Sequence, residues 1–487
     1  MNKLLNLNLW RGYLAVALFA MAALSCTNHT KPNKETIAKK PNVVIILADD
    51  LGWGDVGFNG CTDIPTPNLD ALASDGVIFT SGYASHSYCG PSRSGLLTGK
   101  YQARFGCGNN LSKDLDGPQG LPTNETFISN VLKEDGYNTC AIGKWHLGDS
   151  IQFWPTQRGF DDWYGFTGGA RNYWGQSWDK KSLPWHLIRR NGEPVPLEEQ
   201  GYLTDDFTNE AINYIDDYTK SDKPFFMYLA YNAPHAPIQA TKEYLNKTEH
   251  IENGKRAAYG GLVVGMDEGI GKVIAKLKEA GEYENTLFFF YSDNGGHGSG
   301  TRQEPYRGRK GNLFEGGIRV PFLMTWPAGL KGGKQYHKPI VAYDIFTTIL
   351  GATQINYSKS ADLDGTNLLP YVKGKVNNEP HDKIFWRYSD GLGYAVRKGD
   401  YKLVKEEVRQ ELFLFNMKTD SLEQFNLAAA MPEKLNELKA DYTEWNKGNI
   451  NNLWPDAHPE HVYKEKAIRE RAIKAACGGE NKKPNQY

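Results

Sequence analysis

Three stretches of this chain are apolar at nearly every position, and each is only as long as a β-strand. They lie at residues 43–48, 225–231 and 286–291. A strand that is apolar on both faces is buried on both faces, as in a parallel sheet covered by helices. Further segments with the pattern of helices or short strands separate the three runs, at residues 69–75, 77–79, 127–134, 139–142 and 257–280. This alternation predicts an α/β fold, a three-layer sandwich built around a large and mostly parallel sheet.

The pattern changes after about residue 371. Short strand-like segments separated by turn residues are followed by one helical segment, which predicts a small antiparallel sheet packed with a helix. The expected segments are residues 384–388, 393–398, 401–405, 412–416 and 432–445. We therefore expect a large domain over residues 41–372, a C-terminal subdomain over residues 373–475 and a tail over residues 476–487.

The N-terminus has the features of an export signal. Lys3 and Arg11 precede or flank an apolar stretch at residues 13–24, which is too short for a convincing membrane span. The stretch ends in Ser25-Cys26, which is typical of a bacterial lipoprotein cleavage site. We interpret residues 1–25 as a signal peptide, Cys26 as a lipidated first residue and residues 26–40 as a tether. This places the protein in the periplasm, or on the outer membrane or cell surface, of a Gram-negative bacterium.

Ala23 leaves an alternative to lipidation, because this position is usually Leu in lipoproteins, so plain secretory cleavage stays open. The charge balance argues against other kinds of membrane or nucleic-acid contact. The chain has 56 basic and 57 acidic residues and a net charge of -1, so no global field attracts nucleic acid or an acidic membrane surface. We expect no nucleic-acid partner, and contact with a membrane only through the lipid anchor.

Two of the expected strands end in paired oxygen ligands. Asp49-Asp50 follows the first apolar run, and Asp293-Asn294 follows the third. Ligand sites of open α/β sheets lie just outside the carboxyl ends of strands, so the two pairs meet if the strands are neighbours. Carboxylate and amide oxygens suit Ca²⁺ or Mg²⁺. Taken singly, Asp293-Asn294-Gly295 reads equally as a hairpin turn and Asp49-Asp50 as a helix N-cap.

Candidate anion-binding residues lie in three further segments. Lys144 and His146 follow a strand two residues apart, so an extended backbone points both side chains the same way. His235 lies in a loop stiffened by prolines after the second apolar run, and Lys310 lies in the basic run at residues 307–311. Each feature alone is also typical of a structural histidine or of a solvated basic face.

The run Cys89-Gly90-Pro91-Ser92-Arg93, closed by Leu97-Thr98-Gly99, is the most specific motif of the chain. It resembles the signature of the type I sulfatases, the formylglycine-dependent branch of the alkaline phosphatase superfamily that includes arylsulfatases. The segments around the metal and anion candidates resemble that family's motifs in the same order. The resemblance implies that a formylglycine-generating maturation enzyme oxidises Cys89 to formylglycine (3-oxoalanine), whose hydrate supplies the nucleophilic hydroxyl.

The resemblance also implies a role for each candidate residue. One Ca²⁺ ion is held by Asp49, Asp50, Asp293 and Asn294 together with residue 89. Lys144 and Lys310 bind sulfate oxygens, His146 acts on the formylglycine hydroxyl, His235 protonates the leaving oxygen, and Ser92 and Arg93 position residue 89. A dianionic transition state develops at sulfur, and preplaced cations stabilise it.

The implied function is hydrolysis of sulfate esters in a sulfated polysaccharide or its oligosaccharides. Algal glycans such as carrageenan or ulvan and glycosaminoglycans all stay open, although the His235 segment looks closest to the branch acting on 4-sulfated galacto-configured sugars. Residues 153–190 are rich in Trp and contain Arg171. We expect them to stack a sugar and pair with further anionic groups, or else to form a loop anchored in the core.

Two alternative functions remain. The first is a formylglycine-dependent phosphonate or phosphate ester hydrolase of the same superfamily. The second is a catalytically inert surface lipoprotein that binds glycans and keeps Cys89 as an unmodified, inert thiol. The other four cysteines of the exported chain are either paired in disulfides or free and buried, and sequence leaves both open for Cys61, Cys107, Cys140 and Cys477.

Overall fold

The computed structural model describes residues 39–111, 118–175, 186–298 and 300–455. The signal peptide, Cys26, most of the tether, Cys477 and the C-terminal tail lie outside these residues, and what we expect of them stays a prediction. The described residues from Lys40 onward belong to one compact unit, and the boundary at residues 372/373 also stays a prediction. No helix of the described residues is long and apolar enough to cross a membrane.

Ten strands of the described residues form one mixed sheet with a parallel centre. Its strands, in spatial order, are β11 (Lys334–Tyr336), β2 (Val77–Phe79), β10 (Phe322–Thr325), β9 (Thr286–Ser292), β1 (Asn42–Ala48), β8 (Phe225–Ala230), β4 (Asn138–Lys144), β5 (Asp162–Phe166), β6 (Arg189–Arg190) and β7 (Glu193–Pro194). The four strands β9, β1, β8 and β4 are parallel neighbours, so their carboxyl ends share one edge of the sheet. A short separate pair joins β3 (Gly82–Tyr83) to β12 (Ile340–Val341).

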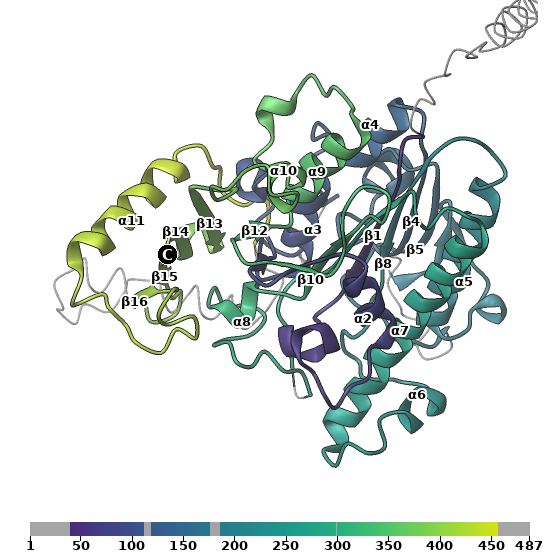
Figure 1. The fold of residues 1–487 in the computed structure, drawn as a ribbon, viewed down its shortest axis with the longest axis horizontal. Coiled ribbons are helices and arrows are strands. Elements are labelled where there is room, and N and C mark those ends of the chain that lie inside the picture. The colour runs from purple at the N-terminus through teal and green to yellow at the C-terminus, as the bar shows by residue number, and fades with distance from the viewer. Residues whose placement is uncertain (1–38, 112–117, 176–185, 299, 456–487) are drawn as a thin grey trace, which may run out of the picture. The chain divides into compact units, whose positions relative to one another are not determined.

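Helices cover both faces of the sheet, as the runs of apolar residues predict. Along β1, Val43, Ile45 and Leu47 enter one hydrophobic cluster and Val44, Ile46 and Ala48 enter the other. Figure 1 shows α5 and α7 on one side of the central strands and α3 and α9 on the other. The first layer contains α2 (Pro67–Ser74), α5 (Leu203–Tyr218), α6 (Lys242–Asn246) and α7 (Gly254–Glu279), and the second α3 (Cys89–Thr98), α4 (Ile128–Glu134), α9 (Asp344–Thr353) and α10 (Leu369–Val372).

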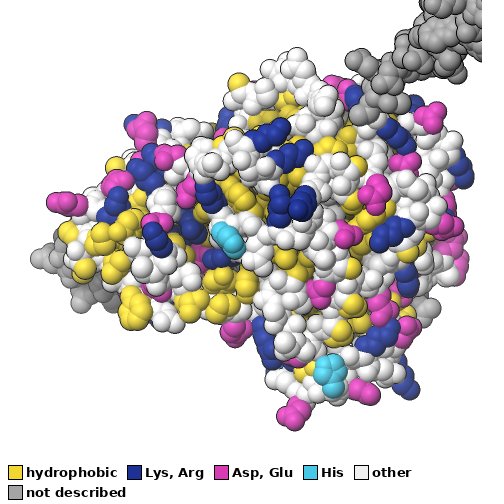
Figure 2. Space-filling model, viewed as in Figure 1, with side chains coloured by type: hydrophobic (Ala, Val, Ile, Leu, Met, Phe, Trp, Pro, Cys, Tyr) yellow, Lys and Arg dark blue, Asp and Glu magenta, His cyan; other side chains and the backbone are white. Residues whose placement is uncertain are grey.

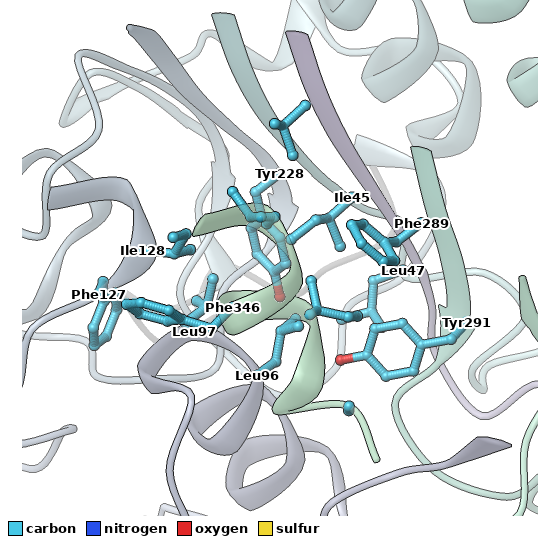
Figure 3. Packing of buried hydrophobic residues seen from close by; sticks show 14 of the residues in the cluster. Ile45, Leu47, Leu96, Leu97, Phe127, Ile128, Tyr228, Phe289, Tyr291 and Phe346 are labelled. Atoms are coloured by element: carbon cyan, nitrogen blue, oxygen red, sulfur yellow. The ribbon is translucent and has the colours of Figure 1, made fainter. Parts of the chain in front are cut away.

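The core beneath α3 is a close packing of strand and helix side chains (Figure 3). Ile45, Tyr228 and Phe289 come from neighbouring strands, and all are almost fully buried. Leu96 and Leu97, in the last turn of α3, belong to the same hydrophobic cluster, so this end of the helix packs against the sheet. Every residue of α3 is buried, so Cys89, its first residue, is held in place by the surrounding protein.

The C-terminal subdomain agrees with the sequence prediction almost residue by residue. Its antiparallel strands are β13 (Lys383–Tyr388), β14 (Gly393–Lys398), β15 (Tyr401–Lys405) and β16 (Leu412–Asn416), and its helix is α11 (Pro432–Asn446). The rings of Tyr394 and Tyr442 stack with centroids 3.7 Å apart and join this sheet to α11. One further short helix, α8 (Glu315–Ile318), packs its residue Ile318 into the hydrophobic cluster of this subdomain.

Candidate active site

The candidate ligands of the metal come together at the strand edge that the sequence predicts. Ala48 of β1 is paired with Ser292 of β9, so the residues that follow both strands are neighbours. The Asp50 backbone N–H donates to Asp293 Oδ1 at 3.3 Å, and Asn294 Nδ2 donates to Asp50 Oδ1 at 2.7 Å. Asp50 has a φ of 64°, a left-handed conformation that turns the chain sharply after β1.

Cys89 is the first residue of α3 and faces these carboxylates. Its Sγ lies 3.5 Å from Asp49 Oδ1 and 3.9 Å from Asp50 Oδ1. Ligand atoms of Asp49, Asp50, Cys89 and His235 all lie within 4.8 Å of one another. Burial raises the pKa of the Cys89 thiol to about 12, although Lys144 and Lys310 favour the thiolate. An unmodified Cys89 is therefore a protonated and poor nucleophile.

This donor set fits a hard cation, with one exception. Asp49, Asp50, Asp293 and Asn294 offer oxygen atoms, and Asn294 Oδ1 is buried without a hydrogen-bond partner among the described residues. Buried polar atoms are normally paired, so this oxygen is available to a ligand. The sulfur of Cys89 is the exception, because Ca²⁺ takes oxygen ligands and thiolate suits softer metals.

Three cationic side chains surround the carboxylates. Lys144, the last residue of β4, places Nζ 2.6 Å from Asp49 Oδ2. Lys310 places Nζ 2.6 Å from Asp50 Oδ1 and 3.2 Å from Cys89 Sγ. The third, Arg93, lies one helical turn after Cys89 and is fully buried.

Arg93 holds the strand ends in place. Its Nε and Nη2 lie 2.9 and 2.8 Å from Asp293 Oδ2, and its Nη1 donates to the Lys144 carbonyl at 2.7 Å. The guanidinium thus ties α3 to β9 and β4 at once. Ser92, its neighbour, has a buried hydroxyl with no hydrogen-bond partner among the described residues.

The two candidate histidines lie in the same cluster. His235 Nε2 is 3.5 Å from Asp50 Oδ2, and its Nδ1 donates to the Ala236 carbonyl at 2.6 Å, since only a donor fits that acceptor. Burial, with help from Lys310 and Lys144, lowers the pKa of His235 to about 3 despite the Asp50 carboxylate. Both features leave Nε2 of a neutral imidazole directed into the site.

His146 lies beside the start of α3. Burial lowers its pKa well below the usual value, and Lys144 and Arg93 add to the effect. Its Nδ1 has no hydrogen-bond partner among the described residues. Gly169 makes room for the ring, because a Cβ at that position would lie 2.5 Å from His146 Nε2.

Arg171 is the one candidate that the structure does not bring to the cluster. Its side chain is buried, with Nε donating to the His186 carbonyl and Nη2 to Gln200 Oε1, both at 2.7 Å. The guanidinium also donates to the Asn172 carbonyl at 3.4 Å. These contacts match the alternative of an anchored loop and leave the expected contact with substrate without support.

The structure adds a residue that no motif indicated. Asn110 Oδ1 accepts a hydrogen bond from the Gly90 N–H at 3.0 Å and so caps the first turn of α3. A Cβ at Gly90 would lie 3.0 Å from the same oxygen, which explains the glycine after Cys89. Asn110 is 20 residues from Gly90 in sequence, so its role depends on the fold and not on a local pattern.

The described cysteines outside the site are free. Cys107 and Cys140 are buried and Cys61 is half-buried, and none of them forms a disulfide in the described part of the chain. Burial raises the pKa of all three thiols. Of the two alternatives left open by the sequence, free cysteine holds for these residues.

The comparison with protein families identifies the chain. The model of the family described as Sulfatase matches residues 41–355, more than half of the sequence. This protein belongs to the sulfatase family. A second model, described as the C-terminal region of N-sulphoglucosamine sulphohydrolase, matches residues 309–446. The sulfatase is a sulfuric ester hydrolase with the α/β fold that the sequence predicts.

Individual relatives agree with the family. The sulfatase is 35% identical to N-acetylgalactosamine-6-sulfatase of Mus musculus over 384 residues, which cover 74% of this chain and 71% of the relative. It is 30% identical to the uncharacterized sulfatase YdeN of Escherichia coli, covering 85% and 87% of the two chains. Among solved structures, the sulfatase is similar to Ps i-CgsB, whose crystal structure is solved in complex with k-i-k-neocarrahexaose. The two sequences are 35% identical, the TM-score is 0.83, and the match covers 90% of this chain and 100% of Ps i-CgsB.

Charged side chains of both signs lie on the face of the molecule that Figure 2 shows. Figure 2 shows basic and acidic side chains interspersed over one face, as expected for a net charge of -1. Binding of an anionic group therefore depends on local charge at the site. Lys144, Lys310 and Arg93 supply that charge within the cluster.

Proposed function

We propose that this sulfatase removes sulfate groups from a sulfated polysaccharide or its oligosaccharides, using formylglycine formed from Cys89 and one bound Ca²⁺ ion. The observation that carries the proposal is the position of Cys89. Cys89 is the first residue of a buried helix. Its Sγ lies 3.2 Å from Lys310 Nζ and 3.5 Å from Asp49 Oδ1. A reacting group at this position has a cation on one side and metal ligands on the other.

Oxidation of Cys89 resolves the mismatch in the donor set. A maturation enzyme that converts the residue to formylglycine replaces a soft sulfur with oxygen, and the hydrated aldehyde then offers a hydroxyl both as nucleophile and as hard ligand. Asp49, Asp50, Asp293 and Asn294 would hold the calcium ion together with that hydroxyl. When bound, the ion supplies positive charge that lowers the pKa of the hydroxyl and stabilises the charge developing on sulfate.

The chain's own cations and histidines supply the rest of the chemistry. Lys144 and Lys310 are placed to bind sulfate oxygens and to stabilise a dianionic transition state. His235 directs Nε2 into the site, and the anionic substrate raises its pKa from the value in the free protein, so it can hold the proton that the leaving alcohol needs. His146, neutral and with Nδ1 unpaired, is placed to accept a proton from the hydroxyl of residue 89.

A glycan substrate is supported by the relatives. Ps i-CgsB is solved with k-i-k-neocarrahexaose, and the mammalian relatives are named for N-acetylgalactosamine-6-sulfate. Both are carbohydrates, which makes a sulfated glycan the substrate class we propose here.

The test measures turnover and modification together. We expect hydrolysis of an aryl sulfate and of members of a panel of defined sulfated oligosaccharides, with aryl phosphonate a much poorer substrate. Mass spectrometry of the peptide over residues 80–100 should show formylglycine at residue 89. In a host without serine oxidation, Cys89→Ser should fold and bind sulfated glycan while turnover falls by at least about a thousandfold, because the hydrate is lost.

Cys61→Ser is the matched control, since it removes a half-buried thiol away from the cluster and should keep its activity. Preference for the aryl phosphonate would assign the protein to the related phosphonate hydrolases. An unmodified Cys89 in active protein from the native host would refute the formylglycine mechanism.

A further inference from the structure

A buried group of charged side chains connects the C-terminal sheet to the loop that carries Lys310. Lys402 of β15 is fully buried, and its Nζ lies 2.7 Å from Glu315 Oε1 and 2.9 Å from Glu423 Oε1. Arg319 pairs with the other oxygen of Glu315 at 3.1 Å. We refer to Lys402, Glu315, Glu423 and Arg319 as the linking cluster.

Three of the four carboxylate oxygens of the linking cluster accept hydrogen bonds, and the fourth, Glu423 Oε1, has only its ion-pair contact with Lys402. Glu315 Oε2 also accepts the Tyr83 hydroxyl at 2.7 Å, and Glu423 Oε2 accepts the Glu315 backbone N–H at 2.7 Å. Burial favours a neutral Glu315, but Lys402 and Arg319 outweigh it and hold the pKa of Glu315 below its usual value. Loss of Lys402 would leave two buried carboxylates without their shared cation.

Residues of the same cluster contact the loop from Arg307 to Gly316. Arg307 Nη1 donates to the Glu423 carbonyl at 3.1 Å, and the Gly316 N–H donates to the Arg307 carbonyl at 2.7 Å. Both ends of the loop are therefore tied to residues at or beside Glu315 and Glu423. Lys310 lies between these ends, and its position depends on theirs.

The middle of the loop reaches the active site. The Lys310 N–H donates to the Gly296 carbonyl at 3.2 Å, and the Gly311 N–H donates to the Ser87 carbonyl at 3.0 Å. These bonds connect the loop to the segment after β9 and to the segment before Cys89. Lys310 then spans the remaining distance to Asp50 and Cys89 with its side chain.

We propose that Lys402 is a positioning residue for Lys310, so that the C-terminal subdomain takes part in setting the geometry of sulfate binding. The inference rests on the proposed function, because it takes Lys310 as a ligand of the substrate sulfate. Stability alone does not account for such a cluster, since a buried ion pair often contributes no more than an apolar packing of the same volume. The same contacts also fix the loop from Arg307 to Gly316, and the position of this loop determines where Lys310 lies in the active site.

Lys402→Met keeps most of the side-chain length and removes the charge. We expect kcat/KM for an aryl sulfate to fall on the order of 100-fold, because a shift of about 1 Å in a positioned group has effects of that size. The inhibition constant of inorganic sulfate should rise in parallel, which measures binding without turnover. Lys402→Arg should recover part of both.

Two further variants separate positioning from folding. Lys402→Met combined with Glu423→Gln removes one charge of each sign, so it keeps the balance of the cluster and should fold while still losing activity. Lys398→Met is the matched control, because Lys398 forms ion pairs with Glu437 and Asp441 of α11 and touches no part of the loop. It should change kcat/KM by less than about twofold.

A double-mutant cycle with Lys310→Ala decides the mechanism. If Lys402 acts through Lys310, Lys402→Met causes little further loss in the Lys310→Ala protein, either in kcat/KM or in affinity for sulfate. Equal losses in both backgrounds, or no loss in the wild-type background, would overturn the inference. A wild-type protein that fails to hydrolyse any sulfate ester would instead refute the proposed function, so the two failures are distinguishable.

Discussion

The linking cluster and the catalytic cluster around Cys89 are both buried clusters of charge, and they differ in which polar atoms they leave unpaired. In the linking cluster, all four carboxylate oxygens of Glu315 and Glu423 lie within 2.9 Å of a donor or cation, although Glu423 Oε1 makes this contact as an ion pair without a hydrogen bond. In the catalytic cluster around Cys89, Asn294 Oδ1, His146 Nδ1 and Ser92 Oγ are buried without a hydrogen-bond partner among the described residues. Unpaired buried polar atoms are costly, so three of them beside the candidate metal ligands favour a site that binds a group from outside the protein.

The comparison predicts opposite responses to substitution. Removing a side chain from the catalytic cluster should reduce activity with little loss of stability, because its contacts to the protein are incomplete. Removing a side chain whose polar atoms are used by the protein should reduce stability, and it should affect the chemistry only where, as we propose for Lys402, its contacts also position a residue of the catalytic cluster. The predictions below test this contrast.

The largest effect is expected at His235. In His235→Ala, kcat/KM for a sulfated oligosaccharide should fall by about 10²- to 10⁴-fold, because the leaving alcohol loses its proton donor. A nitrophenyl sulfate should lose far less, since its leaving group needs no proton. The melting temperature should hardly change, as it should in the control His337→Ala, which alters an exposed histidine. Equal losses with both substrates would assign His235 to binding and not to proton transfer.

The next effect concerns calcium and the stability of the folded state. A ligand that binds only the folded protein stabilises it by about 2.7 kcal/mol at a free concentration 100 times its dissociation constant. We expect a gain of that order when calcium is added to protein treated with a chelator, measured by thermal unfolding. Asp50→Asn should abolish most of the gain, because it weakens the central oxygen ligand. Asp217→Asn, an exposed carboxylate on α5, should keep it. A full calcium response in Asp50→Asn would place the ion elsewhere.

The fold was largely predictable because its strands are short runs of unusual composition. Val43 to Ala48 is apolar at each position since both faces of β1 pack against helices, and that pattern is visible in the sequence. Turn residues likewise marked the C-terminal strands, as at residues 399–400 between β14 and β15.

The site was predictable where motifs follow strand ends and was not where contacts join distant segments. Asp49 and Asp293 come directly after β1 and β9, so topology brings them together. Asn110 and Lys402 belong to no motif, and their contacts with Gly90 and Glu315 span 20 and 87 residues of sequence. Those contacts depend on how loops and subdomains pack, which no local pattern encodes.

The smallest effect on catalysis is expected at Arg171. The sequence left open whether this segment binds substrate or forms an anchored loop, and the structure shows a buried guanidinium with hydrogen bonds inside the loop. In Arg171→Ala, the His186 carbonyl and Gln200 Oε1 lose a charged donor. The free energy of unfolding should fall by about 1–3 kcal/mol, because the hydrogen bonds of a buried guanidinium to this loop are lost. Both kcat and KM for an oligosaccharide should stay within about threefold of wild type, since Arg171 touches no residue of the catalytic cluster. Arg171→Lys is the matched variant and should recover part of the stability by restoring one donor. The reverse result, a tenfold rise in KM with unchanged stability, would show that Arg171 binds substrate. It would contradict the interpretation that Arg171 only anchors the loop.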